Sequence, residues 1–200
     1  MDWIAVALLV DLPAGQALPR RVNDVDLAIW RSASGVVQAW GDRCPHRGMR
    51  LSHGFVRGET LACIYHGWRY DTDGVCRVIP AHPDLIPPAT ICAQTYRCQA
   101  TDGLIWVALD ETETAPPDLG DRRPLRSLEV ARSGAEVARY FGTDLASVIP
   151  IGGPHDLALA LQPRTEDSCL IHALVPKGQD RKAVSRHLED LRAELEAVAQ

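Results

Sequence analysis

The sequence contains little that would suit a membrane, an exported chain or a nucleic acid. No apolar run approaches the ~20 residues that a membrane-spanning helix needs. The opening segment, residues 1–4, carries Asp2 where a signal peptide has basic residues, so export is not expected. The formal net charge is −5, which does not suit a nucleic-acid surface. These absences favour a soluble cytoplasmic protein with no membrane or nucleic-acid partner.

The chain of 200 residues contains six cysteines. That length is enough for one or two domains with a proper apolar core. In an oxidising compartment the cysteines outside the motifs described below could form disulfides, whereas in the cytosol we expect small buried thiols. These four residues are Cys76, Cys92, Cys98 and Cys169.

Two short runs that pair cysteine with histidine are the most informative feature present. Residues 44–48 read CPHRG and residues 63–68 read CIYHGW, so the spacings are C-x-H and C-x2-H. Two thiolates and two imidazoles can hold a [2Fe-2S] cluster in which one iron takes both sulfurs and the other both imidazoles. The four predicted ligands are Cys44, His46, Cys63 and His66.

A structural zinc ion is the alternative for the same four donors. Zinc fingers usually pair cysteine with cysteine and histidine with histidine, whereas each run here supplies one of each. The runs also carry Gly48 and Gly67 at matching places, where the missing Cβ lets backbone N–H groups approach cluster sulfurs. We therefore favour the iron–sulfur interpretation.

With its flanks, this pattern resembles the Rieske domain of the non-haem oxygenases that hydroxylate aromatic rings or remove O-methyl groups. The similar segments are 41–47, 66–71 and 78–80, and the resemblance covers about the first 110 residues. It implies an antiparallel β-barrel or sandwich with the cluster loops at one end. It also implies a flavin-type reductase and/or an oxygenase component as partners.

Three positions within the motif bear on the reduction potential. Quinol-oxidising members of the resembled family have an extra cysteine in each run and a serine near a sulfur, where this chain has Met49, Tyr65 and Trp68. A hydroxyl hydrogen bond to a cluster sulfur stabilises the reduced state. Without it, we expect a potential toward the lower end of the roughly −150 to +300 mV Rieske span.

The pattern of apolar residues and turns predicts three regions. Residues 1–110 read as the Rieske-like β domain, residues 111–124 as an acidic, Thr- and Pro-rich linker, and residues 125–200 as a small α+β domain. Within the first region we expect strands or hairpins at 3–10, 25–30 with 36–40, 61–64, 70–78 and 104–109.

The third region is predicted to contain about three strands and a C-terminal helix, and is similar to a truncated remnant of an oxygenase catalytic domain. The expected strands are 137–141, 157–161 and 169–175, of which the second alternates leucine with alanine. A helix is expected from about Asp180. Its apolar stripe consists of Val184, Leu188, Leu191, Leu195 and Val198.

A mononuclear iron site, which the resembled oxygenases hold with a D-x2-H-x4-H-like run and a later acid, is not expected here. After residue 66 no two histidines lie closer than fifteen residues. These histidines are His82, His155, His172 and His187. We therefore assign no catalytic residue and do not expect the chain to oxygenate a substrate alone.

The functional interpretation is a low-potential [2Fe-2S] electron-transfer protein that serves a multicomponent oxygenase. One alternative is an oxygenase subunit whose mononuclear iron lies on a partner chain. Another is a redox-sensing or scaffold protein. Arg43, Arg47 and Arg50 flank the first run; they either form a docking patch for an acidic partner or are solvated and unrelated to docking.

Overall fold

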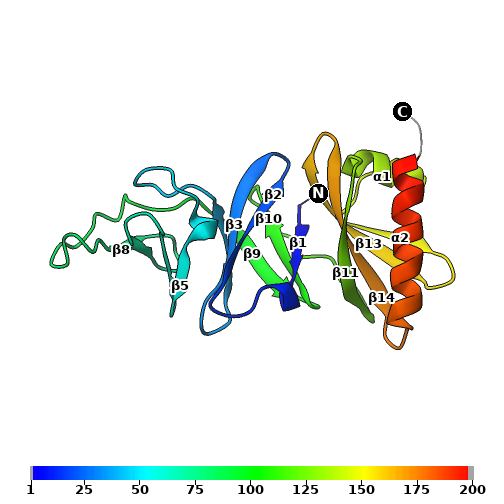
Figure 1. The fold of residues 1–200 in the computed structure, drawn as a ribbon, viewed down its shortest axis with the longest axis horizontal. Coiled ribbons are helices and arrows are strands. Elements are labelled where there is room, and N and C mark those ends of the chain that lie inside the picture. Colours follow the sequence, from blue (N-terminus) through cyan, green and yellow to red (C-terminus); the bar gives the residue numbers. More distant parts are fainter. Residues whose placement is uncertain (1, 198–200) are drawn as a thin grey trace.

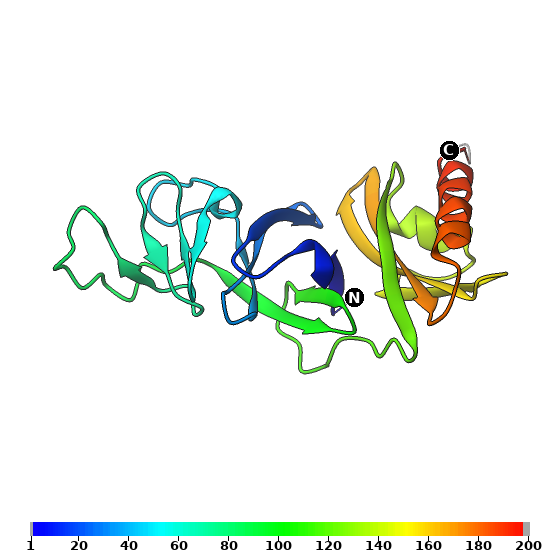
Figure 2. The ribbon, with the colours of Figure 1, turned by 60° about the horizontal axis from the view of Figure 1, so that its bottom comes forward.

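Three antiparallel sheets follow one another along the long axis of the computed structural model, which describes residues 2–197 (Figure 1). A small four-stranded sheet lies at one end, a six-stranded sheet in the middle, and a second four-stranded sheet covered by a helix at the other end (Figure 2). This mainly β architecture with a C-terminal helix confirms the predicted fold class.

The central sheet has the strand order β1-β10-β9-β4-β3-β2. Its strands are β1 (Ile4–Leu8), β2 (Ala17–Val22), β3 (Val25–Arg31), β4 (Val37–Gly41), β9 (Thr95–Thr101) and β10 (Leu104–Ala108). The predicted pairing of 25–30 with 36–40 is confirmed, since Trp30 lies opposite Gln38 in the β3–β4 hairpin. A short 3-10 helix, η1 (Leu9–Asp11), follows β1.

The small sheet positions both cysteine–histidine runs. It consists of β5 (Phe55–Arg57), β6 (Thr60–Ala62), β7 (Arg69–Tyr70) and β8 (Cys76–Val78). The first run leaves the end of β4 and leads through the 3-10 helix η2 (Leu51–His53) into β5, and the second run joins β6 to β7. The predicted hairpin at 70–78 is present, and the Asp71 carboxylate closes its turn by accepting from the amides of Asp73 and Val75.

The third sheet has the order β11-β14-β13-β12. Its strands are β11 (Arg122–Val130), β12 (Val148–Gly152), β13 (Leu157–Thr165) and β14 (Ser168–Pro176). The strands expected at 157–161 and 169–175 lie within β13 and β14, whereas β11 and β12 were not predicted. Residues 109–121, between β10 and β11, form no helix or strand.

The strand predicted at 137–141 is wrong, because residues 137–140 belong to a helix, α1 (Gly134–Tyr140), and Phe141 is its C-cap residue. Ser133 caps this helix: its hydroxyl accepts from the Glu136 amide, and the Glu136 carboxylate accepts from the Ser133 amide. Such a reciprocal capping box satisfies two amides that would otherwise lack partners, which favours a helix start over an extended strand. Val137 and Ala138 are the apolar residues that this helix buries.

The two faces of β13 pack against different parts of the molecule. Leu157, Leu159 and Leu161 belong to a core shared with the C-terminal helix α2 (Arg181–Ala197). Ala158 and Ala160 point to the opposite face. There they pack with Trp3, which directly precedes β1, and with Trp106 of β10. The leucine–alanine alternation thus lets one strand carry a helix on one face and the central sheet on the other.

The predicted C-terminal helix is confirmed, and its stripe is buried at Val184, Leu188, Leu191 and Leu195. Val198, the last member of the predicted stripe, and Met1 lie outside the described residues. Across residues 2–197, neither α1 nor α2 combines the length and the hydropathy needed to cross a bilayer.

Candidate metal centre

Two loops of the same construction carry the four predicted ligands. In each loop the cysteine amide donates to the carbonyl five residues later, at 2.8 Å for Cys44 and 2.9 Å for Cys63. The amide of the glycine four residues after the cysteine donates back to the cysteine carbonyl, at 2.8 Å for Gly48 and 2.9 Å for Gly67. Both glycines have a left-handed backbone, with φ of 70° and 69°, which explains why glycine recurs at this place.

The two thiols face the interior. Cys44 and Cys63 are 4% and 3% exposed, and the Cys63 thiol contacts that of Cys44. Burial raises the pKa of the Cys63 thiol, while the backbone amides of Tyr65 and His66 act in the opposite direction. The second loop therefore aims backbone N–H groups at the buried Cys63 sulfur. These donors would stabilise a thiolate once a metal is bound.

The two imidazoles lie together on the outer side of the loops. The ring centroids of His46 and His66 are 4.8 Å apart; His66 is exposed and His46 is partly buried. The Trp68 ring stacks on His46 at 4.1 Å, and the Tyr65 ring lies 3.9 Å from His66. Partial desolvation, with smaller effects of His66 and Arg47, lowers the pKa of His46. This favours the neutral form that can ligate a metal.

Tyr70 lies at the candidate site, and the sequence analysis gave it no role. Its hydroxyl lies 3.1 Å from the Cys44 sulfur, and its ring is fully buried beside Trp40. Burial, reinforced by the contact with Cys44, raises the pKa of Tyr70, so the phenol keeps its proton. A hydroxyl donor thus faces a predicted ligand from β7 rather than from the position that Trp68 occupies. The signal that the sequence offers is the position of Tyr70 at the start of the hairpin predicted at 70–78.

A buried carboxylate anchors the first loop. Asp42, 1% exposed, accepts from the amide and the hydroxyl of Ser52, both at 2.7 Å. It also accepts from Arg50 at 3.1 Å, and Arg50 pairs with Asp26 at 2.9 Å. Arg50, one of the three arginines considered for a docking patch, is therefore held by two carboxylates of its own chain. Arg43 and Arg47 remain exposed.

The donor arrangement fits a two-iron cluster better than a zinc ion. A structural zinc requires four donors around one point. Within residues 2–197 no group of three or more His, Cys, Asp or Glu side chains is arranged to hold a single ion. A two-iron cluster takes two protein ligands per iron. Here the buried pair of thiols could hold one iron and the outer pair of imidazoles the other.

The comparison with known families agrees with this geometry. The family model described as the Rieske [2Fe-2S] domain matches residues 2–97. Residues 2–97 form a Rieske domain. Such a domain implies a [2Fe-2S] cluster, and the resemblance drawn from the two runs and their flanks is confirmed.

Curated relatives are similar to more than half of this chain. The oxidoreductase NdmD of Pseudomonas putida is 38% identical over 121 residues, which cover 60% of this chain and 21% of NdmD. The 4beta-methylsterol monooxygenase of Methylococcus capsulatus is 39% identical over 129 residues, covering 60% of this chain and 33% of the relative. The chain thus spans about a fifth to a third of the length of these relatives.

Solved structures extend the likeness beyond the Rieske domain. Dicamba monooxygenase bound to dicamba has a TM-score of 0.79 at 22% identity, over 98% of this chain and 85% of that chain. NdmB of Pseudomonas putida CBB5 has a TM-score of 0.74 at 19% identity, over 98% of this chain and 81% of that chain. The shared fold therefore includes the third sheet as well as the Rieske domain.

Beyond the Rieske domain, two histidines converge that are far apart in sequence. His155 and His187 have ring centroids 5.5 Å apart, and His155 Nδ1 lies 3.4 Å from Gln179 Oε1. His172 is separate and fully buried, between the Ser127 hydroxyl and a main-chain carbonyl. The described residues bring no third His, Cys, Asp or Glu into a metal-holding group with the pair. The expectation of no mononuclear iron stays a prediction.

Proposed function

We propose that this chain holds a [2Fe-2S] cluster on its four paired ligands and passes single electrons to, or within, a multicomponent oxygenase. The ligands are Cys44, His46, Cys63 and His66. The observation that carries the proposal is the division of these donors between a buried thiol pair and an imidazole pair that reaches the surface at His66.

The side chains around the site suit electron transfer to another protein. When bound, the cluster accepts and releases one electron at a time. The buried thiols lie in an apolar core that keeps water away from the sulfurs. The exposed His66 edge offers a redox partner a short approach, next to Tyr65, which is 53% exposed. Exposed Arg43 and Arg47 add positive charge, which favours an acidic surface on the partner.

We propose a midpoint potential below zero at neutral pH. Trp68 offers no hydroxyl to a sulfur, which favours a low value, whereas the Tyr70 hydroxyl acts in the other direction from beside Cys44. A redox titration monitored by EPR measures the midpoint potential that results from these two opposing effects. A midpoint near the upper end of the Rieske range, about +300 mV, would contradict the low-potential proposal.

The ligand proposal is tested by metal analysis of anaerobically purified protein. We expect about two irons and two acid-labile sulfides per chain, and little zinc. His66→Cys replaces a neutral imidazole with a charged thiolate, so it should lower the potential and change the EPR line shape. His82→Cys, at an exposed histidine outside both loops, is the matched control and should alter neither. One zinc per chain and no acid-labile sulfide would overturn the assignment.

A second candidate is an oxygenase component whose mononuclear iron lies on a partner chain. It is favoured by the fold shared with dicamba monooxygenase over 98% of this chain. On this proposal the chain co-purifies with an oxygenase chain and supports turnover only in its presence. Alone, with reductant, oxygen and an aromatic or methoxy substrate, it should yield no hydroxylated or demethylated product. Turnover by the isolated chain, abolished by His155→Ala, would contradict both candidates.

A further inference from the structure

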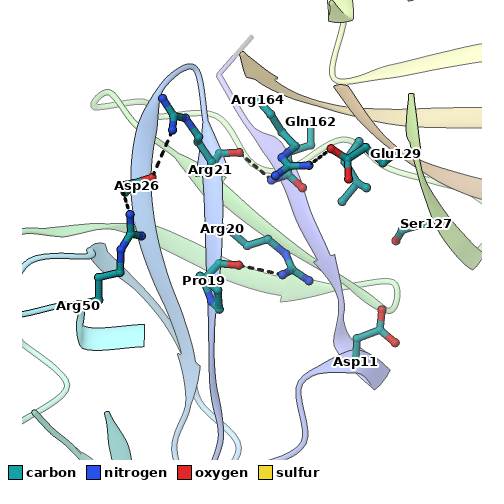
Figure 3. A pocket seen from close by; sticks show the side chains of 11 residues that line it. Asp11, Pro19, Arg20, Arg21, Asp26, Arg50, Ser127, Glu129, Gln162 and Arg164 are labelled. Carbon is teal, nitrogen blue, oxygen red and sulfur yellow. Dashed lines mark hydrogen bonds and ion pairs between the residues drawn. The ribbon is translucent and has the colours of Figure 1, made fainter. Parts of the chain in front are cut away.

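An open cavity of about 510 Å³ lies between the Rieske domain and the third sheet (Figure 3). One wall comes from β2 and β3, and the other from β11, β13 and β14. Its volume lies in the range of small-molecule sites. The cavity contains none of the four proposed cluster ligands, so it is separate from the metal centre.

Charged side chains of both signs line the cavity walls. Four arginines line it, against three carboxylates from Asp11, Asp26 and Glu129. Arg21 and Arg50 both pair with Asp26, at 4.0 and 2.9 Å. The third pair joins Arg164 to Glu129. Arg21 also pairs with Asp24 at 2.7 Å and Arg50 with Asp42 at 3.1 Å, so three of the four cavity arginines have carboxylate partners.

Arg20 is that remaining arginine. It donates to the main-chain carbonyls of Val6 at 2.6 Å and Pro19 at 2.9 Å, and it forms no ion pair with any described residue. Desolvation by burial lowers the pKa of its guanidinium, although Asp11 acts in the opposite direction. A partly buried cation without a bound carboxylate is a natural partner for an anion, since a charge-assisted hydrogen bond would offset its lost hydration.

Gln162 supplies an independent observation. This side chain is 1% exposed, and its amide nitrogen donates to the Arg21 carbonyl at 2.9 Å. Because that carbonyl can only accept, the bond fixes the orientation of the side-chain amide and identifies the other atom as Oε1. Oε1 is buried and has no hydrogen-bond partner among the described residues. It points toward the space in front of Arg20 (Figure 3), so the cavity offers an acceptor that lacks a donor.

We propose that this cavity binds a small organic anion. Its carboxylate or phosphate group pairs with Arg20, and a hydroxyl or amine on the same molecule donates to Gln162 Oε1. The site goes beyond the proposed electron transfer, because it uses neither the cluster ligands nor the exposed imidazole edge.

Calorimetric titration of the full chain with its cluster bound tests the proposal. The probes are 4-hydroxybenzoate, benzoate, glycerol 3-phosphate and inorganic phosphate. The first two probes carry a carboxylate and the last two a phosphate group. Within each pair, the first probe has a hydroxyl on carbon and the second has none. We expect saturable binding of at least one probe with a hydroxyl on carbon, about tenfold tighter than its counterpart. Only that probe has a donor far enough from its acid group to reach Gln162 Oε1 while the acid group pairs with Arg20.

Arg20→Gln should weaken binding at least tenfold. Arg31→Gln is the matched control, since Arg31 also donates to two main-chain carbonyls, those of Gly35 at 3.1 Å and Leu12 at 3.4 Å, but lies outside the cavity. This control should bind like the wild type. If Arg20→Gln does not fold, Arg164→Gln removes another cavity charge and should also weaken binding several-fold.

Absence of saturable binding by all four probes, or an affinity unchanged in the arginine variants, would overturn the proposal. Iron content and EPR spectra of the same samples report on the metal centre. A failure of ligand binding is therefore distinguishable from a failure of the proposed electron-transfer function.

Discussion

At the scale of single residues, the hydroxyl of Tyr70 is placed to tune the potential of a cluster held by Cys44. It lies 3.1 Å from the Cys44 sulfur, and such a bond strengthens when an added electron makes the sulfur more negative. Tyr70→Phe should therefore lower the midpoint potential. A loss of about 1 kcal/mol between oxidation states corresponds to roughly 40 mV for one electron.

Redox titration of the Tyr70→Phe variant measures this shift. Tyr96→Phe is the control, since Tyr96 is another partly buried phenol but packs in the core of the central sheet. Equal potentials in the wild type and Tyr70→Phe would show that the hydroxyl does not act on the cluster.

His172 makes stability depend on pH. It is fully buried, Nε2–H donates to the Ala5 carbonyl at 3.1 Å, and Nδ1 accepts from Ser127 at 2.8 Å, so both nitrogens are satisfied in the neutral form. Desolvation lowers the pKa of His172 to about 4. Between about pH 6.5 and 4 the unfolded chain therefore binds a proton that the folded chain does not.

The free energy of unfolding should accordingly fall as the pH drops through this window, by up to about 3 kcal/mol from His172. Urea unfolding at several pH values measures the loss. His172→Gln should show a smaller loss between pH 7 and 4 than the wild type, whereas His82→Gln, at an exposed site, should match it. The same pH dependence in all three proteins would refute the role of His172.

The candidate ligands stand out in the sequence, but their surroundings do not. Cys44, His46, Cys63 and His66 stand in two local runs whose spacing alone indicates metal chemistry. Tyr70 contacts Cys44 from strand β7, 26 residues later in the sequence, so only the folded structure reveals the contact. Interactions between residues distant in sequence leave no periodic or spacing signal.

At the scale of elements, α2 stabilises the third sheet without approaching the metal centre. Leu188 is fully buried in the core between this helix and the sheet. Leu188→Ala should cost about 2–5 kcal/mol of unfolding free energy, because it removes buried apolar area and leaves a cavity. Urea unfolding gives the loss, and Arg186→Ala on the exposed face of α2 serves as control. The EPR spectrum should be unchanged in both variants, and an altered spectrum in Leu188→Ala would contradict this separation.

Some elements of the third sheet were predictable and others were not. The leucine–alanine alternation of β13 identified that strand, because its two faces have packing partners of different size. Strand β12 contains Pro150, which usually argues against a strand, but β12 lies at the sheet edge, where a missing N–H is tolerated. The α1 helix is signalled by the Ser133–Glu136 capping box, which the prediction of a strand at 137–141 leaves out of account.

At the scale of the whole molecule, one apolar core joins the Rieske domain to the third sheet. Trp3 and Trp106 pack there with Ala158, Ala160 and Leu174. His172 adds its hydrogen bond to the Ala5 carbonyl in β1. The domain boundaries predicted at 110 and 125 stay a prediction. Wherever these boundaries fall in the sequence, the Rieske domain and the third sheet share buried surface.

This shared core predicts a single cooperative unfolding transition. Tryptophan fluorescence reports on the first part, because all five tryptophans lie there, and far-UV circular dichroism at 222 nm is weighted toward α1 and α2 in the second part. Denaturation curves from the two signals should coincide. Two separated midpoints would show that the parts unfold independently. The tryptophans are Trp3, Trp30, Trp40, Trp68 and Trp106.

The position of β1 also affects how the chain assembles during translation. All five of its residues are buried, and its hydrogen-bonding partner β10 follows about a hundred residues later, with Ile4 opposite Val107. At typical synthesis rates that interval is roughly 5 to 20 seconds. During it the nascent β1 has neither its strand partner nor the third sheet to cover it. Until β10 and β13 have been made, β1 is therefore an apolar segment of the nascent chain that lacks its native cover.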